Sequence, residues 1–232
     1  MRFTWIAVLG ILLLVSQVQA QEQPALQTEK DKVSYSIGID IGNTLKRQAI
    51  DVNLDLVTRG LKDAMTGEKF LMTEEQIVET VTNFRKEMMA KQQEQAKKLG
   101  EKNKKEGEAF LEENKKKEGV QTLPSGLQYK VIKPGTGKKP KPTDNVTTHY
   151  RGTLVDGTEF DSSYKRGTPV TFPVNGVIPG WTEALQLMQE GAKWQLFLPP
   201  NLAYGERGAG RDVGPNATLI FEVELISVQE NK

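Results

Sequence analysis

The spacing of apolar residues changes near Gly119, and this change limits the folds that the chain can adopt. Before that residue, apolar side chains recur every three or four positions, which is the spacing of one face of a helix. After it, apolar and polar residues alternate, as they do in a strand with one buried face. A chain of 232 residues has room for one or two domains. The pattern therefore predicts a helical N-terminal part followed by an α+β domain.

The first twenty residues have the composition of an export signal. Arg2 is their only charged residue, and an apolar stretch from Trp5 to Val15 follows it. This stretch is shorter than the roughly 20 apolar residues that cross a bilayer, and small Ala20 suits a cleavage site. We expect a signal peptide over residues 1–20 and a periplasmic protein, with outer-membrane association as a further option. An uncleaved anchor is the alternative, and no later segment has the length and apolar character of a membrane span.

Two short helices are expected between residues 29 and 66. The apolar stripe of the first consists of Val33, Ile37, Ile41 and Leu45. The stripe of the second consists of Leu54, Val57, Leu61 and Met65. Asn53 suits the N-cap of the second helix and Gly67 its end. Because two short helices cannot bury both stripes by themselves, we expect residues 21–72 to form a helical domain that makes a homodimer.

A much longer helix is expected over residues 73–118, because no proline occurs there. Its first turns carry a further stripe, made of Ile77, Val81, Phe84 and Met88, which we assign to the same dimer interface. Residues 91–108 contain Leu99 as their only large apolar residue, which is typical either of a solvated helix between domains or of a disordered segment. We favour the helix. Gly100 and Gly107 are expected to weaken this helix, so that the two sheet domains of the dimer move independently of one another.

The rest of the chain, residues 119–232, carries the strand pattern. Alternating sets of apolar residues begin at Leu127, Val146, Val170, Trp194 and Phe221. Asp156-Gly157 is a hairpin signal. One short helix is expected where Trp181, Ala184, Leu185 and Met188 have helical spacing. The sequence predicts an antiparallel sheet wrapped around that helix.

The composition excludes the more familiar kinds of catalytic site. The chain has no cysteine, which removes disulfides, thiolate metal sites and a cysteine nucleophile. It has a single histidine, His149, so that no pair of histidines can hold a metal. Lys and Arg number 31 against 30 Asp and Glu, and this balance provides no general positive field for nucleic acid. We expect no metal, no cofactor and no nucleic-acid partner.

The strand region also contains aromatic residues in short, distinct motifs. These are Tyr150-Arg-Gly, Asp156-Gly-Thr-Glu-Phe160-Asp161, Val177-Ile178-Pro-Gly-Trp181, Ala203-Tyr204-Gly205 and the run from Gly214 to Leu225. In this order and spacing they resemble the FKBP-type peptidyl-prolyl cis-trans isomerases over about residues 120–228. Asp31–Gly38 and Leu123–Tyr129 resemble one subgroup of that family, the exported dimeric proteins of the macrophage infectivity potentiator (Mip) type.

The resemblance implies an isomerase that acts on proline-containing unfolded or exported polypeptides. The implied catalytic residues are Tyr150, Phe160, Asp161, Ile178, Trp181, Tyr204 and Phe221. The implied substrate-binding residues are Arg166, Phe172, Val177 and Val213. Trp181 would form the floor under the prolyl ring, while the Ile178 N–H and the Tyr204 hydroxyl would hold substrate carbonyls. Asp161 would be oriented by Tyr150 and Arg166.

The chemistry of this bond is compatible with a site of aromatics and one carboxylate. An X-Pro amide rotates slowly because its C–N bond has partial double-bond character, with a barrier of about 18–20 kcal/mol. Amide resonance separates charge, so an apolar pocket weakens it and lowers the barrier. No nucleophile, metal or cofactor is needed. His149 alternates with Tyr150 and is expected to point away from the pocket.

Some positions depart from the family pattern. Val170 stands where the family often has another aromatic residue. Ala209 and Asp212 stand where small eukaryotic relatives have His and Ile. These departures leave the isomerase assignment intact and bear on substrate preference and on the binding of rapamycin-type macrolides.

Two other functions are compatible with the same features. One is a dimeric chaperone or peptide-binding protein whose cleft holds unfolded chains while catalysis is secondary. The other is a passive binding module with an inactive pocket, against which the presence of Asp161, Trp181 and Tyr204 argues. An experiment on the isolated sheet domain separates the chaperone from the isomerase reading. We expect that domain to keep peptide turnover and to lose the ability to protect an unfolding client protein.

Overall fold

The computed structural model describes residues 26–230, so the signal peptide predicted over residues 1–20 lies outside the described part. The chain divides into two compact units, one ending at Thr73 and the other starting at Glu74. Across residues 26–230, no helix has both the length and the apolar character needed to cross a membrane. The predicted division into residues 21–72, 73–118 and 119–232 stays a prediction.

The first unit contains the two predicted short helices, α1 (Glu29–Arg47) and α2 (Leu54–Thr66), and both are confirmed. Asn53 caps α2 as expected, because its side chain accepts hydrogen bonds from the backbone N–H groups of the first turn. α1 has a capping box between Thr28 and Asp31 that the sequence analysis did not identify. None of the residues in the apolar stripe of α1 is buried, and Val33 and Ile37 are exposed.

The second unit begins with the predicted long helix, α3 (Glu74–Asn114), which has 41 residues. Residues 91–108 are helical as expected, but this helix is not solvated on every side, because Gly100 and Gly107 are buried. The two glycines lie against the segment before the last strand, where the lack of a Cβ atom lets the backbones approach closely. Glycines add nothing to a stripe of large apolar side chains, so the pattern of such side chains does not predict this packing face.

A seven-stranded antiparallel sheet forms the body of this unit. Its strands are β1 (Val120–Thr122), β2 (Gln128–Lys133), β3 (Asn145–Leu154), β4 (Glu159–Ser162), β5 (Val170–Pro173), β6 (Lys193–Leu198) and β7 (Leu219–Gln229). The order is β1-β2-β6-β7-β3-β4, and β5 also pairs with β3. All five predicted sets of alternating residues fall at these strands, whereas β1 and β4 contain no such set.

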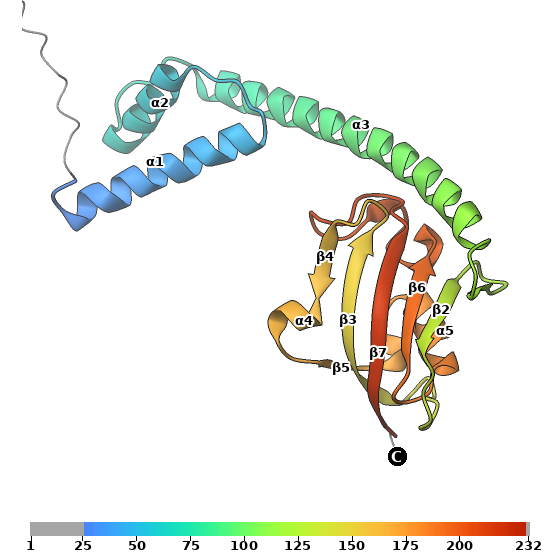
Figure 1. The fold of residues 1–232 in the computed structure, drawn as a ribbon. Helices are drawn as coiled ribbons and strands as arrows, with labels where there is room; N and C mark the ends of the chain where they lie inside the picture. Colours follow the sequence, from blue (N-terminus) through green and yellow to red (C-terminus); the bar gives the residue numbers. More distant parts are fainter. Residues whose placement is uncertain (1–25, 231–232) are drawn as a thin grey trace, which may run out of the picture. The chain divides into compact units, whose positions relative to one another are not determined.

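The sheet packs around α5 (Pro179–Leu187), as Figure 1 shows. Trp181, Ala184, Leu185 and Met188 have the predicted helical spacing and join the core that the sheet provides. The turn at Asp156-Gly157 connects β3 to β4, and Gly157 has a φ of 87° there. The connection from β4 to β5 contains α4 (Ser163–Arg166), and three short 3₁₀ helices follow: η1 (Val174–Gly176), η2 (Pro200–Leu202) and η3 (Gly205–Arg207).

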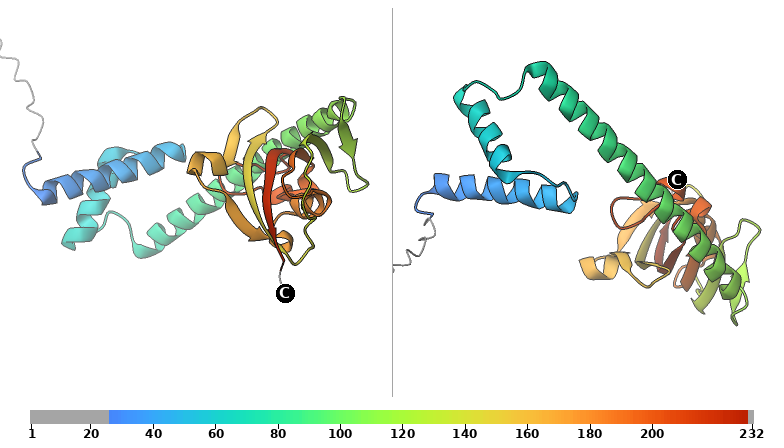
Figure 2. Two further views of the ribbon diagram at one scale, coloured as in Figure 1. Left: turned by 60° about the horizontal axis from the view of Figure 1, so that its bottom comes forward. Right: turned by 90° about the horizontal axis from the view of Figure 1, so that it is seen from above.

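The C-terminal half of α3 lies across the end of the sheet that carries the β3–β4 turn (Figure 2). The Phe110 ring packs on the Phe197 ring of β6, with 5.9 Å between their centroids. The buried Asn114 amide donates a 3.0 Å hydrogen bond to the Gln128 side chain at the start of β2. Helix α3 is therefore packed against the sheet as part of the same unit.

Candidate active site

A cavity of about 450 Å³ lies beside the N-terminal end of α5. It is lined by Tyr150, Phe160, Asp161, Val170, Phe172, Gly176, Val177, Ile178, Trp181, Tyr204 and Phe221. Nine of the eleven predicted site residues are in this lining. They come from β3, β4, β5, β7 and the segments around α5 and η2, so the fold collects them from most of the chain after residue 149.

Trp181 forms a buried aromatic floor. It lies in the first turn of α5, and only 4% of it is exposed. The rings of Tyr150 and Phe221 each meet it nearly edge-on, with centroids 5.2 Å away, and Phe172 meets it at 5.6 Å. Edge-to-face contacts are preferred aromatic geometries and hold rings in fixed orientations. The indole ring is therefore held by contacts on several sides.

Gly152 on β3 makes room for the aromatic wall beside this floor. A Cβ atom there would lie 2.7 Å from Phe160 Cζ and 2.8 Å from Phe221 Cε1. These two rings pack edge to face over the glycine, with centroids 5.5 Å apart. The pairing between β3 and β4 also shifts register between Gly152 and Thr153. A residue with a side chain would push the rings apart and reshape the cavity.

The one carboxylate in the lining, Asp161, is held by two neighbours. The Tyr150 hydroxyl donates a 2.5 Å hydrogen bond to Asp161 Oδ2, and the Arg166 guanidinium binds Oδ1. Arg166 also donates a 2.8 Å hydrogen bond to the Tyr150 hydroxyl oxygen. Asp161, Tyr150 and Arg166 thus form a closed triangle at the edge of the cavity, which we call the carboxylate triad. Arg166 belongs to α4 and lies outside the cavity lining, so it acts through the other two residues.

The protonation states of the triad follow from its hydrogen bonds. Burial alone would raise the pKa of Asp161, but the hydrogen bonds from Tyr150 and Arg166 outweigh it and lower that pKa below its ordinary value. Burial, together with the hydrogen bond to Asp161, raises the pKa of Tyr150. At neutral pH the carboxylate is therefore ionised and the phenol is neutral. Because both of its oxygens already accept hydrogen bonds, the carboxylate is poorly placed to take a proton from a substrate.

Two polar groups at the rim are available to a ligand. Tyr204 is 40% exposed, and burial of its hydroxyl and the negative charge of Asp161 both raise its pKa. Its hydroxyl therefore stays protonated and can donate. The second group is the backbone N–H of Ile178, the residue that immediately precedes α5. The Ile178 carbonyl accepts hydrogen bonds from the N–H groups of Trp181 and Thr182. This capping turn holds the Ile178 backbone in one conformation.

The cavity lining also differs from the predicted set of site residues at Val213, Gly176 and Val170. Val213 does not line the cavity; it is buried in the core, and its backbone pairs with Ala209 in the loop before β7. Gly176 lines the cavity but was not predicted, and Val170 was identified only as a departure from the family pattern. The proximity of Gly176 to the Val177-Ile178 motif was the available signal.

His149 lies outside the cavity lining, as expected from its alternation with Tyr150. Its ring stacks on Tyr164 with centroids 4.6 Å apart, and its Nδ1 lies 2.9 Å from the Ser163 hydroxyl. Within residues 26–230, no group of three or more His, Cys, Asp or Glu side chains is placed to hold a metal ion.

Two family models match the chain. The domain amino terminal to FKBP-type peptidyl-prolyl isomerase matches residues 30–131, and FKBP-type peptidyl-prolyl cis-trans isomerase matches residues 136–226.

Named proteins are similar over nearly the same length. Outer membrane protein MIP of Legionella longbeachae is 50% identical over 230 residues, which are 99% of this chain and 98% of that protein. Peptidyl-prolyl cis-trans isomerase Mip of Coxiella burnetii is 47% identical over 205 residues, 88% of this chain and 89% of that protein. Among solved structures, FkpA from Escherichia coli matches with a TM-score of 0.67 and 38% identity, covering 88% of this chain and 99% of that one.

Proposed function

The chain belongs to the family of FKBP-type peptidyl-prolyl cis-trans isomerases, and from that premise we propose that it turns X-Pro bonds in the aromatic cavity. The observation that carries the proposal is the combination of a fixed indole floor with a tied carboxylate. The cavity brings apolar surface to the amide and fixed hydrogen-bond donors to its carbonyls. These are the two features that lower the barrier to rotation about an amide bond.

In the proposed mechanism, the prolyl ring lies on Trp181 and the aromatic walls exclude water from the amide. Loss of water weakens the charge-separated resonance form, and this lowers the barrier to rotation. The Ile178 N–H and the Tyr204 hydroxyl bind the flanking carbonyls and favour the twisted amide over either planar isomer. The carboxylate triad keeps Tyr150 and the β4 edge in place, and no bond is made or broken.

The test compares two buried tryptophans. Trp181→Leu removes the floor, whereas Trp194→Leu removes an indole that stacks on Tyr129 outside the cavity, 4.4 Å between centroids. Turnover of prolyl tetrapeptides, varied in the residue before proline, should fall about 10- to 100-fold in the first variant. It should change little in the second once unfolded protein is accounted for. Equal losses in both variants would contradict the assignment of this cavity.

We also propose that the chain acts outside the cytoplasm, on exported polypeptides. The pattern of residues 1–20 supports this, and the similar protein from Legionella longbeachae is named as an outer membrane protein. N-terminal sequencing of the protein from a periplasmic extract should begin at Gln21. A chain that begins at Met1 would support the uncleaved anchor instead.

Homodimer formation through the first unit and the first turns of α3 is a further part of this proposal. Val33 and Ile37 of α1 are each 56% exposed, and Phe84 of α3 is 42% exposed. Apolar stripes of this kind are normally buried against a partner. A second copy of the chain is the simplest partner, because the same stripes would then cover one another.

We propose chaperone action as a second activity. Leu56 of α2 lies outside the stripe that we assign to the dimer and is 58% exposed, which leaves apolar surface available to an unfolded client. The fragment Glu74–Lys232 keeps the second unit whole and should retain peptide turnover. It should lose the ability to prevent aggregation of an unfolding client protein. Equal protection by fragment and full chain would contradict a role for the first unit.

The same cavity is proposed to bind rapamycin-type macrolides, which present an apolar ring and carbonyl groups. Val170 widens the wall where an aromatic residue is common in the family. Competition by such a macrolide in the prolyl-peptide assay tests this, and unchanged turnover at a saturating concentration would contradict it.

A further inference from the structure

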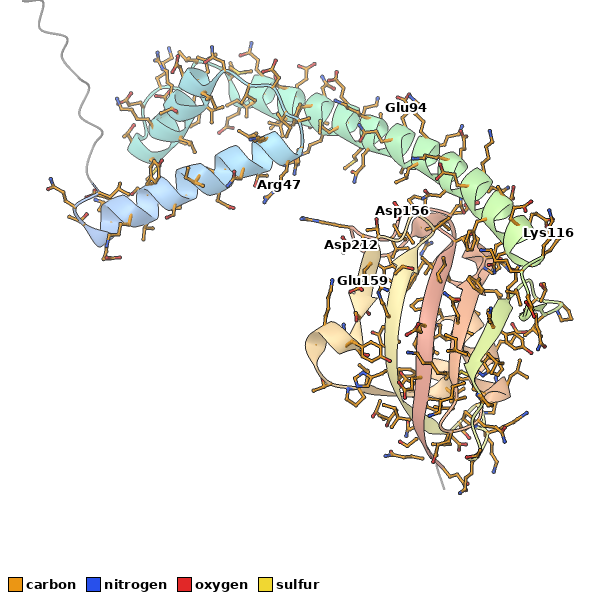
Figure 3. All side chains as sticks on the ribbon, in the orientation of Figure 1. Arg47, Glu94, Lys116, Asp156, Glu159 and Asp212 are labelled. Carbon is orange, nitrogen blue, oxygen red and sulfur yellow. The ribbon has the colours of Figure 1, made fainter. Side chains whose placement is uncertain are left out.

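The loop between Tyr204 and β7 connects two residues of the cavity. We call residues 205–218 the rim loop: Tyr204 immediately precedes it, and Phe221 follows it by three positions. Figure 3 shows Asp212 of this loop and Asp156 of the β3–β4 turn at the end of the sheet over which α3 passes. The rim loop is therefore bordered by the cavity on one side and by helix α3 on the other.

Helix α3 contacts the rim loop at successive turns. The Asn103 side-chain amide donates a 2.8 Å hydrogen bond to the Pro215 carbonyl. A Cβ atom at Gly214 would lie 3.0 Å from both Leu99 Cδ2 and Asn103 Nδ2, so helix and loop touch there. A Cβ atom at Gly100 would lie 3.2 Å from Pro215 Cβ. The close approach at Pro215 depends on the absence of a side chain at Gly100.

One turn further along, Gly107 meets the end of the same loop. A Cβ atom at Gly107 would lie 2.2 Å from Thr218 Oγ1 and 3.0 Å from Thr218 Cβ. Thr218 is 2% exposed, and its hydroxyl has no hydrogen-bond partner among residues 26–230. The contact is therefore steric, and its fit depends on glycine in the helix.

The contact at Pro215 has a direct route to Tyr204. Asn216, the next residue, has a φ of 54°, and its N–H donates a 2.8 Å hydrogen bond to the Gly205 carbonyl. Gly205 is the immediate neighbour of Tyr204. The Asn103 amide thus holds the loop at Pro215. The hydrogen bond from Asn216 in turn holds Gly205, which is bonded to Tyr204, the residue with the rim hydroxyl.

The helix is itself anchored independently of the loop. Phe110 packs on Phe197, and Gln128 donates a 2.9 Å hydrogen bond to the Leu111 carbonyl in addition to its bond with Asn114. These contacts are with β6 and β2, not with the rim loop. Helix α3 can therefore act as a fixed support on which the loop rests.

We propose that Asn103 of α3 is a positioning residue for the isomerase reaction, because it holds the rim loop so that the Tyr204 hydroxyl faces the substrate carbonyl. The proposal rests on the proposed function, since it requires Tyr204 to contact the substrate. It gives the long helix a second role besides connecting two units. Asn103 is not a catalytic residue and touches no reacting atom.

The first experiment is a double-mutant cycle in the full-length protein between Asn103→Asp and Tyr204→Phe. Asn103→Asp keeps the side-chain shape but replaces the donor that faces the Pro215 carbonyl with an acceptor. It should lower kcat/KM for a prolyl tetrapeptide about three- to tenfold, the size of typical coupling through packed contacts. In the Tyr204→Phe background the same substitution should cost less than about twofold, because the hydroxyl that it positions is gone.

Two controls separate positioning from general damage. Glu101→Gln changes an exposed residue of the same helix two positions away and should leave kcat/KM unchanged. Hydrogen exchange should show faster amide exchange in residues 205–218 for Asn103→Asp, with the strands β3 and β7 unchanged. A merely structural role for Asn103 would lower thermal stability without this loop-specific signal or the coupling to Tyr204.

A second pair of variants tests the steric part of the contact. Gly107→Ala improves helix propensity but places a methyl group against Thr218, so it should lower turnover. Adding Thr218→Ala removes the hydroxyl that the methyl group meets, at no cost in hydrogen bonds, and should restore most of the turnover.

The outcomes distinguish this inference from the proposed function. If Tyr204→Phe lowers turnover but Asn103→Asp does not, the inference is overturned and the proposed function stands. An Asn103→Asp loss of equal size in both backgrounds overturns it as well. If Tyr204→Phe leaves turnover unchanged, the role of Tyr204 in the proposed function fails, and the inference fails with it.

Discussion

Asp161 and Tyr204 are the polar residues on which the proposed reaction depends, and their roles differ in kind. Asp161 is tied to Tyr150 and Arg166, so it holds the edge of the cavity. Tyr204 is 40% exposed at the rim and can reach a substrate carbonyl. Neither acts as a nucleophile, and the loss of either is therefore expected to reduce turnover without abolishing it.

Tyr204→Phe removes one donor, and we expect turnover of a prolyl tetrapeptide to fall about tenfold. Loss of a donor to a full oxyanion costs more, but a twisted amide develops less charge. Asp161→Leu should fall further, up to about 100-fold, because it also releases Arg166 and Tyr150. Peptide turnover measured beside circular dichroism checks both. Complete inactivity of a folded Tyr204→Phe protein would indicate a chemical role for the hydroxyl, and full activity of Asp161→Leu would show that the cavity is wrongly assigned.

The same residues predict the pH dependence. The pKa of Asp161 is lowered from 3.8, so its carboxylate stays ionised above about pH 5. The pKa values of Tyr150 and Tyr204 are raised from 10.0, so both stay neutral up to about pH 9. We expect kcat/KM to be flat between these limits.

Below that range the sign is set by Asp161. Its folded-state pKa is depressed, so the stability that it contributes is present above its unfolded pKa and is lost as pH falls through the folded value. Turnover and thermal stability should therefore decline together as the pH falls below about 5. A pH–rate profile with an inflection between about pH 6 and 8 would contradict this account.

At the scale of single elements, strand β3 shows what the sequence could and could not predict. Its alternation predicted the strand and the inward side of Tyr150, and the motif at Phe160-Asp161 predicted the neighbouring wall. The need for Gly152 could not be predicted, because it arises from two rings that come from β4 and β7. Strand β4 also has no alternating set of apolar residues, because Phe160 is the single apolar residue among its four.

Helix α3 shows the same limit more strongly. Its length and its freedom from proline were sufficient to predict it, but the face that packs on the loop uses Gly100, Asn103 and Gly107 beside Leu99. The two glycines and the asparagine favour solvent or a turn when judged alone. Their role depends on the shape of the loop before β7, which lies more than a hundred residues further along the chain.

Gly152→Ala is the prediction that belongs to this scale. Alanine should lower the melting temperature and turnover together, because overpacking of this kind costs about 1–3 kcal/mol. Adding Phe160→Leu removes one of the two aromatic rings that the methyl group would meet. The double variant should therefore be less destabilised than the sum of the two single changes. Thermal unfolding of all four proteins checks this, and strict additivity would argue against the close packing at Gly152.

At the scale of the whole molecule, the chain combines an isomerase unit with apolar helices that it leaves uncovered. Val33 and Ile37 are over half exposed, although residues of their kind are usually buried. The exposed stripe of the first unit therefore needs a partner, and we propose that this partner is a second copy of the chain.

Light scattering at micromolar concentration should give the mass of a dimer. Ile37→Glu together with Val33→Glu should shift the protein toward the monomer, because charges would face one another across the interface. Peptide turnover per chain should be unaffected, since the cavity lies wholly within the second unit. A parent protein of monomer mass would contradict the proposed interface.

The central claim is that this cavity speeds rotation about the X-Pro bond without moving a proton. The most direct measurement is kcat/KM for a prolyl tetrapeptide in H₂O and in D₂O at matched pH and pD, on the plateau of the pH profile. With no proton transferred in the transition state, the ratio should be about 1. A ratio of about 2 or more, lost in Asp161→Leu, would contradict the account by showing that the carboxylate takes part in proton transfer.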